Sequence, residues 1–555
     1  MWLFWSELWW WPWRGWVWVR LPFRMVTKCE NGTGGREASV EEYGLDGLAA
    51  SADAVVAGLG PLAAGLARLA VAAGQSVTLE EMELLVSELG REILRGVLQL
   101  ALDRQAAAEV RRAAVTGADG VTRTRAERGH ARLVVTRLGK VIVRRIGYRS
   151  GVRGAGSLFP RDGVLSLPPC GYSWGLQRLA EMFCRSGSYE QAREFVAAAT
   201  GVSIGKRQLE QITAAAAADA ERFCQDRDRA AAGGTGDGQE QQDRPPLAIS
   251  ADGKGVAMRP EARRRRTRAP GQRVRAFDKR RGTGEKGHKR MAETGCVFDV
   301  AVPGGPARTP GQVMCREPGS APDAPRAVNR WYACDITASR DVTIGKIFDE
   351  AERRDPDHRR RWIALVDGDI HQLGLIRGQA AARGIPLVIL VDFIHVLEYL
   401  WKAAWCFHQP RDPAMEDWVT DQGTDILAGR VAGVTARIRQ LAADHPPRPG
   451  SEHAKIIRKT LHYLDAKQPW MDYPRALASG WPIATGVIEG ACRHLVQDRM
   501  GITGARWGLP GAQAILWLRA LHASGDHDAY WDYHLRNEHQ RNHLSRYATT
   551  FELAA

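Results

Sequence analysis

The sequence has little cysteine and no long apolar run, and each absence excludes a class of protein. Its nine cysteines among 555 residues form no Cys-x-x-Cys pair and no Cys/His array at zinc spacing. Neither a disulfide framework nor a structural zinc site is therefore expected, and scattered cysteines are typical of a reducing cytoplasm. No segment approaches the roughly 20 consecutive apolar residues of a membrane helix, so we expect no transmembrane span.

The first residues are rich in tryptophan. Residues 1–25, "MWLFWSELWWWPWRGWVWVRLPFRM", hold eight of the nineteen tryptophans, and Glu7, Arg14 and Arg20 interrupt the run. The segment has no basic start, leucine-rich centre or small-residue cleavage site, so it is a poor signal peptide. We interpret residues 1–39 as either a disordered tail or translation upstream of a start at Met25.

Acidic residues are outnumbered: 77 Lys and Arg face 63 Asp and Glu, a formal net charge of +14. This balance predicts a polyanionic partner, although high arginine usage alone can reflect codon composition. Residues 259–290, here called the basic loop, carry 14 Lys and Arg against three acids, which is +11 of that charge. With few apolar residues, the loop is expected to be mobile when free. It is either a solvated insertion or a clamp for DNA phosphates.

Residues 40–125 are expected to be mainly helical, because they are rich in Ala and Leu at helical spacing. The clearest helix begins at Thr78, where "TLEE" predicts a capping box with Glu81. Its apolar stripe consists of Met82, Leu85, Val86, Leu89, Ile93, Val97 and Leu100. The next region, 126–229, begins with β-rich runs on either side of Gly139-Lys140, which predict a hairpin with basic side chains on one face.

A helix-turn-helix pattern follows the hairpin. A predicted helix from Ser188 to Ala199, a turn at Thr200-Gly201 and a second helix after Ser203 fit this motif. Basic and amide side chains begin the second helix and are predicted to contact DNA; a helical hairpin without DNA contact is an equal alternative. The polar, Gly- and Gln-rich residues 230–246 are a predicted linker.

Beyond the linker, residues 247–400 predict the order β, β, β, α, β, α, β, α, so the chain is a multidomain α/β protein. The first strand, Leu247 to Ala251, ends on Asp252, and the fourth, Trp362 to Val366, ends on Asp367-Gly368-Asp369. A fifth strand runs into Asp392 and His395. This is the order of the ribonuclease-H-like fold. In that fold the ends of adjacent strands one and four bring two carboxylates together, and a later helix brings a third.

A third carboxylate is found in "WPIATGVIEGACRHLVQDRMGITGARWG", residues 481–508. Glu489 begins an amphipathic helix whose apolar face consists of Ile488, Cys492, Leu495 and Val496. Glu489 could simply pair with Arg493, four residues on. Alternatively it joins Asp252 and Asp367, and its small neighbours would let the helix lie close to the sheet. The strand order favours the second interpretation.

Three such carboxylates suit phosphoryl transfer on DNA. Two divalent ions about 3.5–4 Å apart activate the attacking oxygen and stabilise the leaving one, and Mg²⁺ prefers oxygen ligands. We therefore predict that Asp252, Asp367 and Glu489 bind two Mg²⁺ or Mn²⁺ ions. Asp369 remains an alternative to Asp367 as the second ligand.

The phrases "DGKG", "VDGDIHQ", "DFIHVLEYLWKAAW" and residues 481–508 resemble those of the ISKra-type insertion-sequence transposases, relatives of the Mutator-like group with a DDE core. The similarity spans about residues 130–521. It implies a ribonuclease-H-like core with a helical insertion at 401–480, completed by residues 481–525 and followed by a tail at 526–555. Asp252, Asp367 and Glu489 match the catalytic trio. Asp392 and His395 match that group's Cys-or-Asp, two residues, His motif.

The resemblance implies a DNA transposase that cleaves and joins strands at the ends of an insertion sequence. We expect a dimer on DNA, associated with the bacterial nucleoid in the cytoplasm, with no membrane or small-molecule partner. Alternatives are a ribonuclease-H-like nuclease or resolvase without strand transfer, and a catalytically dead, transposase-derived DNA-binding protein. The residues expected to contact DNA are Lys206, Arg207, Gln208, Lys254, Arg263, Arg264, Arg265, Arg266, Arg493, Arg499 and Arg506.

Overall fold

The structure is a computed structural model that describes residues 78–232, 244–263, 289–314, 323–409, 412–502 and 504–548, together with Gly65 and Ala67. The chain divides into two units, residues 1–55 and 56–555, and every described residue belongs to the second. The predictions for residues 1–39 and Met25, for basic-loop residues 264–288 and for linker residues 233–243 lie outside the described residues.

A five-stranded mixed sheet lies at the centre of the described chain, which is α/β as the sequence predicts. The strands follow the order β7-β6-β5-β8-β9 across the sheet. Their bounds are β5 Leu247–Ala257, β6 Lys289–Ala301, β7 Arg326–Asp335, β8 Trp362–Val366 and β9 Leu387–Val391. β5 pairs antiparallel with β6 and parallel with β8, which pairs parallel with β9.

The first strand is longer than predicted. We expected it to end at Ala251, but β5 continues through Asp252 to Ala257, because β6 pairs with it as far as Ala257 and Lys289. β8 has the predicted bounds, and all five of its residues are buried. A short, wholly apolar run of this kind is typical of a parallel strand that is covered on both faces.

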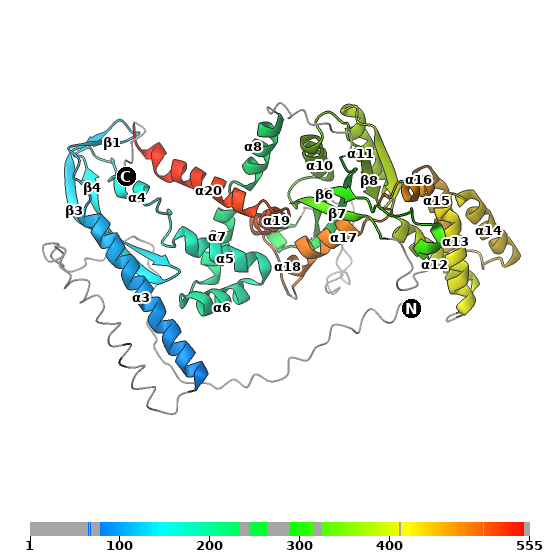
Figure 1. Cartoon of the computed structure of the whole chain (residues 1–555), viewed down its shortest axis with the longest axis horizontal. Coiled ribbons are helices and arrows are strands. Elements are labelled where there is room, and N and C mark those ends of the chain that lie inside the picture. The colour runs from blue at the N-terminus through cyan, green and yellow to red at the C-terminus, as the bar shows by residue number, and fades with distance from the viewer. Residues whose placement is uncertain are drawn as a thin grey trace, which may run out of the picture. The chain divides into compact units, whose positions relative to one another are not determined.

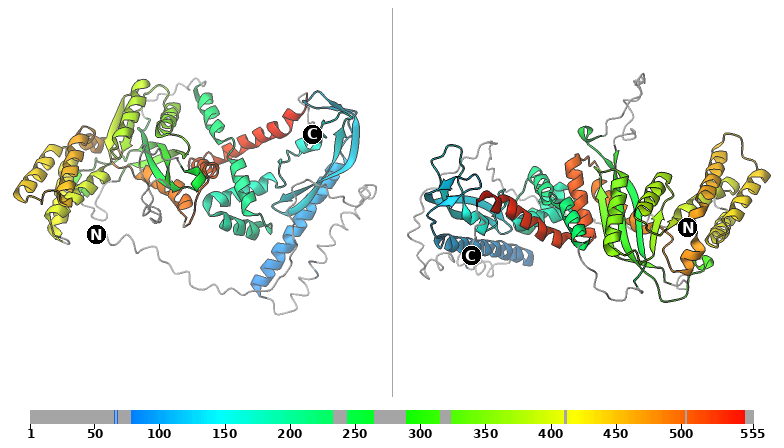
Figure 2. Two further views of the ribbon diagram at one scale, coloured as in Figure 1. Left: turned by 180° about the vertical axis from the view of Figure 1, so that it is seen from behind. Right: turned by 90° about the horizontal axis from the view of Figure 1, so that it is seen from above.

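Three helices follow the strands in the predicted order: α10 Arg340–Arg354, α11 Ile370–Ala382 and α12 Phe393–Phe407. A short helix between the second and third strands, α9 Pro310–Met314, was not predicted. The segment predicted as a helical insertion continues α12 and adds α13 Pro413–Leu427, α14 Val431–Asp444, α15 Glu452–Lys467 and α16 Tyr473–Ala478. Helices α12 to α15 pack on one another and share one apolar core with the sheet (Figure 2). None of the described helices is long and apolar enough to cross a membrane.

The first described helix, α3 Leu79–Ala107, has the predicted capping box between Thr78 and Glu81. None of its residues is buried, and the stripe residues Val86 and Val97 are 52% and 58% exposed. Residues 115–125 were expected to be helical but form two short strands, β1 Val115–Thr116 and β2 Thr122–Arg123. The turn between them is fixed by Asp119, whose carboxylate accepts hydrogen bonds from the Val121 N–H and from the buried Arg123 guanidinium.

The predicted hairpin is present as β3 Arg125–Thr136 and β4 Gly139–Arg149, and α3 lies along it (Figure 1). Its turn is two residues earlier than predicted, because Thr136 pairs with Gly139 and Gly139 has φ +119°. Three arginines of the hairpin form ion pairs with acids of neighbouring helices: Arg144 with Asp103, and Arg132 and Arg145 with Asp162 of α4 Pro160–Val164. Successive residues of a strand point to opposite faces, so Arg144 and Arg145 lie on different faces, and the basic side chains are not confined to one face as predicted.

The predicted helix-turn-helix is formed by α6 Tyr189–Thr200 and α7 Lys206–Ala216, which pack with α5 Trp174–Ser186. Ser188 forms a capping box with Gln191, and Gly201 ends α6 at φ +69°, a conformation that favours glycine. The second helix begins after Gly205 rather than after Ser203. The side chain of Ile204 is fully buried, which keeps the chain extended up to Gly205.

The segment predicted as a C-terminal tail, residues 526–555, contributes the helix α20 His527–Asn542. Aromatic and histidine side chains bury one of its faces: Tyr530, Trp531 and His534 are at most 2% exposed. They pack near α8 Ala220–Ala232 and α19 Leu509–Ala523. The sequence has no aliphatic residues recurring at helical spacing here, so the sequence analysis did not predict this helix.

Arg499 joins the helix-turn-helix to the sheet domain. It lies in α18 Asp498–Met500, is 2% exposed, and donates from Nε to the Cys184 carbonyl at 2.7 Å. Its guanidinium lies 5.1 Å from the Tyr189 ring centroid and 4.7 Å from that of Trp507. Arg499 was expected to contact DNA; its guanidinium is instead largely enclosed by protein, although its Nη2 has no hydrogen-bond partner among the described residues.

We predict that Arg499→Met lowers the free energy of unfolding by about 2–3 kcal/mol, because it removes a charged hydrogen bond and two cation–π contacts. The matched control is Arg493→Met: Arg493 is 80% exposed and should change stability by less than about 0.5 kcal/mol. Denaturant unfolding measures both. Unchanged stability of Arg499→Met would contradict this structural role.

Candidate active site

Three aspartates lie where the parallel pairing of adjacent strands ends: Asp367 and Asp392 follow β8 and β9, and Asp252 lies within β5, just beyond its last pair with β8. Ser250 of β5 pairs with Leu365 of β8, and Val366 of β8 pairs with Val391 of β9. Counting on from these pairs, Asp252, Asp367 and Asp392 come at the same level of the sheet. In open α/β sheets, sites form beyond the carboxyl ends of the strands, so this edge is the candidate site.

Glu489 comes to the site on a helix that changes its pitch. It belongs to α17 Gly486–Ala491, and the chain continues as a π-helical segment, Cys492–Gln497, before α18. The predicted apolar face is buried throughout: Ile488, Cys492, Leu495 and Val496 are at most 3% exposed. Single π-helical turns inside helices are frequent at functional sites. Both α17 and the π-helical segment pack against β5.

Thr485, Asp392, His395 and Glu489 form one hydrogen-bonded network. The Thr485 hydroxyl donates to Asp392 and lies 3.0 Å from Glu489 Oε1. His395 Nδ1 lies 2.9 Å from Asp392 Oδ2 and 4.0 Å from Glu489 Oε1. No Glu489–Arg493 ion pair is present among the described residues, and Arg493 instead lies 4.0 Å from Asp498. The structure thus places Glu489 toward the strand ends.

The network shifts the pKa of each ionisable member. The hydrogen bond to Asp392 raises the pKa of His395 to about 9, so the ring is an imidazolium at neutral pH. Burial alone would raise the pKa of Asp392, but hydrogen bonds from His395, Thr485 and the Ile394 N–H outweigh it and lower the pKa. Burial raises the pKa of Glu489 against the hydrogen bond from Thr485.

Asp367 and Asp369, the two alternatives for the second ligand, have different surroundings. Asp369 caps α11 by accepting from the Gln372 N–H at 2.8 Å, and it lies 3.4 Å from Arg340 Nη1. Asp367 Oδ1 accepts only the Asp369 N–H, at 2.8 Å, and its Oδ2 accepts no hydrogen bond within the described part of the chain. Asp369 is thus committed to its helix, which favours Asp367 as a ligand.

The segment predicted as an insertion also contributes to this edge. Tyr463 of α15 donates from its hydroxyl to the Asp367 carbonyl at 3.2 Å and stacks on Tyr399 with ring centroids 4.0 Å apart. Gly368 permits this close approach: it has φ +93°, and a Cβ there would lie 3.2 Å from the Tyr463 hydroxyl. The loop that carries Asp367 is therefore held from two sides.

Asp252 lies on the first-predicted strand, beside the Glu489 helix. Its Oδ1 accepts the Gly253 N–H at 2.6 Å. The buried Cys492 thiol lies within hydrogen-bonding reach of Asp252, and burial together with this carboxylate raises the pKa of the thiol. Residues three apart on a helix have Cβ atoms about 5–6 Å apart. Glu489 lies three residues before Cys492, about one helical turn away. It therefore lies about one turn from the residue that contacts Asp252.

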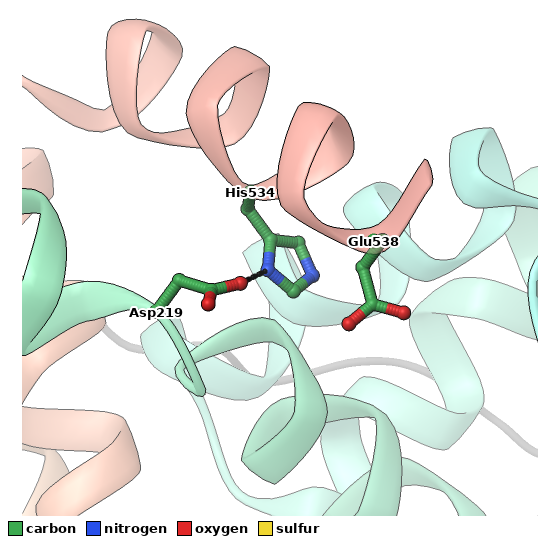
Figure 3. A group of neighbouring side chains, drawn as sticks. All are labelled: Asp219, His534 and Glu538. Carbon is green, nitrogen blue, oxygen red and sulfur yellow. Dashed lines mark hydrogen bonds and ion pairs between the residues drawn. The ribbon is translucent and has the colours of Figure 1, made fainter. Parts of the chain in front are cut away.

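Among the described residues, two clusters could hold a metal ion: Asp392, His395 and Glu489, and, separately, Asp219, His534 and Glu538. The sequence analysis missed the second cluster (Figure 3). There His534 Nδ1 lies 2.6 Å from Asp219 Oδ2, and the Arg541 guanidinium pairs with both Asp219 and Glu538, at 2.6 and 2.8 Å. Because Arg541 supplies positive charge to both carboxylates, the cluster has a structural role in joining α8 to α20.

This second cluster makes stability depend on pH. Burial alone would raise the pKa of Asp219, but His534 and Arg541 outweigh it and lower the pKa to about 2, from 3.8. A depressed carboxyl pKa contributes stability that is present above about pH 4 and lost as the pH falls through 2.

We predict that Asp219→Asn lowers the free energy of unfolding at neutral pH by about 2 kcal/mol, and that the difference from the parent shrinks as the pH approaches 2. Denaturant unfolding at several pH values measures it. Asp528→Asn is the control, because Asp528 is 85% exposed and should have little effect. A difference that does not vary with pH would contradict the ionic account.

The residues expected to contact DNA occupy different environments. Lys206, Arg207 and Gln208 begin α7 and are exposed, although Lys206 also pairs with Glu190 of α6. Lys254, Arg493 and Arg506 are exposed as well. Arg263 is half-buried and donates to the Met258 carbonyl at 3.5 Å. Arg264, Arg265 and Arg266 lie outside the described residues.

Several residues at the site were not predicted to take part in it: Thr485 between Asp392 and Glu489, Arg340 near Asp369, and Tyr463 on the loop of Asp367. Arg340 and Tyr463 lie far in the sequence from the residues they contact, as Thr485 does from Asp392, and none forms a motif by itself. The one available signal was the Thr485-x-x-x-Glu489 spacing, which places both side chains on one helical face.

Neither the scan against protein-family models nor the search of curated proteins gives a match for this chain.

Proposed function

We propose that the protein is a DNA transposase with a DDE site, and that Asp252, Asp367 and Glu489 are its metal ligands. The observation that carries the proposal is the geometry of the sheet edge. Asp252 and Asp367 each come two residues after the last parallel pair of β5 and β8, Ser250 with Leu365, and the Glu489 helix packs against β5.

The topology supports a ribonuclease-H-like core. The first strand of the sheet, β5, lies next to the fourth, β8, as that fold requires of its two carboxylates. The helices α13 to α16 lie in the chain between Asp367 and Glu489, as the proposed insertion requires.

The donor set fits Mg²⁺ or Mn²⁺. Asp252, Asp367 and Glu489 offer only carboxylate oxygens, which these hard cations prefer. His395 offers a ring nitrogen, which these cations prefer less than oxygen, and its Nδ1 is hydrogen-bonded to Asp392. When bound, two such ions would activate the attacking oxygen and stabilise the leaving one.

The protein's own groups prepare the site for this chemistry. The His395 imidazolium offsets part of the repulsion between the Asp392 and Glu489 carboxylates, and the Thr485 hydroxyl, which donates to Asp392 and lies 3.0 Å from Glu489 Oε1, orients both. Arg340, 3.0 Å from Glu293 and 3.4 Å from Asp369, adds positive charge at the rim. Tyr463 holds the loop that carries Asp367.

We predict that Asp252→Asn, Asp367→Asn and Glu489→Gln each lower strand cleavage and joining by on the order of 10²–10³-fold, because each removes one charged ligand and nearly preserves side-chain size. Incubation with DNA carrying the element's ends and Mg²⁺, with products resolved on a gel, measures both steps. Folding and DNA binding should stay near parental levels.

Asp369→Asn is the matched control. Asp369 lies in the same loop as Asp367, but its carboxylate caps a helix, so activity should fall much less. Cleavage without joining by the parent would support a nuclease instead. DNA binding without cleavage by the parent would support a catalytically dead DNA-binding protein. Equal activity of Asp367→Asn and the parent would overturn the proposed ligand set.

A further inference from the structure

A cleft of about 460 Å³ opens between the helix-turn-helix and the sheet domain, away from the carboxylate site. On one side it is lined by α6 and α7, including Arg207 and Glu210. The other side consists of Arg259 just beyond β5, Arg499 and the segment that leads into α19.

The lining is strongly cationic. It contains four arginines and one acid: Arg207, Arg259, Arg499, Arg506 and Glu210. Glu210 lies 3.8 Å from Arg259, at a distance where it neutralises at most one of the four. Guanidinium groups arranged around a cleft are suited to phosphate oxygens, which they bind by charge-assisted hydrogen bonds.

The start of α19 forms part of the same wall. Gly508, Pro510 and Gly511 line the cleft, and the N-cap Gly508 provides no capping side chain. The first N–H groups of this 15-residue helix thus add the positive end of its dipole. A Cβ on Gly508 would lie 4.0 Å from Arg259 Nη1, so the Arg259 guanidinium stands beside the helix start.

A buried donor in the wall lacks an acceptor. Arg499 is 2% exposed, and its Nε is satisfied by the Cys184 carbonyl, but its Nη2 has no hydrogen-bond partner among the described residues. Leaving a buried charged donor unsatisfied costs about 1–3 kcal/mol or more. An anionic oxygen in the cleft would offset that cost, so this atom is independent support for an anion.

The cleft is also connected to the catalytic strand. The Arg259 N–H donates to the Trp507 carbonyl at 2.8 Å, and the Trp507 N–H donates to the Ala257 carbonyl at 3.0 Å, which extends β5 past its end. Arg259 comes seven residues after Asp252, roughly 23 Å along an extended strand. Seven base pairs of B-DNA span about the same length at 3.4 Å each.

We propose that this cleft binds a backbone phosphodiester of DNA, held jointly by the first turn of α7 and by the start of α19. The inference rests on the proposed function, because it takes DNA as the ligand. The cleft holds one DNA strand at a fixed point about seven base pairs from the carboxylate site. Arg259, which the sequence analysis placed only in the basic loop, thereby belongs to a defined binding site.

The test measures binding of the full-length protein to a labelled random duplex over a range of salt concentrations. Arg207→Gln and Arg506→Gln should each reduce the slope of log K against log salt by about 0.9, the value for one lost phosphate contact. Arg359→Gln is the control. Its side chain is 64% exposed and precedes β8, at the sheet edge opposite the strand carboxyl ends, so the slope should not change.

Duplexes with one neutral methylphosphonate linkage locate the contact. A methylphosphonate at the contacted position should weaken binding of DNA by the parent. The same linkage should produce no further loss of affinity in Arg207→Gln or Arg506→Gln. If the parent binds DNA and the cleft variants keep the parental slope, the cleft inference fails and the proposed function stands. If the parent does not bind DNA, both fail. Stabilisation by inorganic phosphate that Arg506→Gln abolishes, with unchanged DNA slopes, would overturn the phosphodiester assignment in favour of a free-phosphate site.

Discussion

The parallel pairing of β8 between β5 and β9 is the constraint on which the rest of the site depends. This pairing puts Asp252, Asp367 and Asp392 at one level of the sheet, because the register of the parallel pairs aligns these three positions. The five buried residues of β8 make the pairing hard to shift. A slip by one residue would turn every side chain of the strand to the opposite face, so the apolar run that fixes the register also fixes the carboxylates.

The helix of Glu489 is fixed to this edge by a different kind of contact. The Thr485 hydroxyl donates to Asp392 and lies 3.0 Å from Glu489 Oε1, and His395 adds a positive charge beside them. Asp392 is fully buried, so its charge must be compensated by these hydrogen bonds. Converging carboxylates repel one another, and the network reduces that repulsion within the protein. It also positions Asp392 and His395 as supports for Glu489, in addition to any direct role.

How much the sequence predicted depended on whether the signal was local. The strand order, the bounds of β8, the capping box at Thr78 and the buried face around Glu489 follow from periodicity and capping, and all were predicted correctly. The length of β5 was not, because it depends on pairing with β6 beyond Asp252. Arg499 was expected to contact DNA, but the rings of Tyr189 and Trp507 and the Cys184 carbonyl largely enclose it, and Tyr189 and Cys184 lie far from it in the sequence. The contacts of Tyr463, Arg340 and Arg541 depend on folding in the same way.

The central claim is that Asp252, Asp367 and Glu489 share bound cations. Its most direct test is a crystal structure of the protein grown with Mn²⁺, in which anomalous scattering locates the ions. The account predicts two peaks about 3.5–4 Å apart, with ligand oxygens from all three carboxylates. A single peak held by Asp392, His395 and Glu489, with Asp252 and Asp367 taking no part, would contradict it.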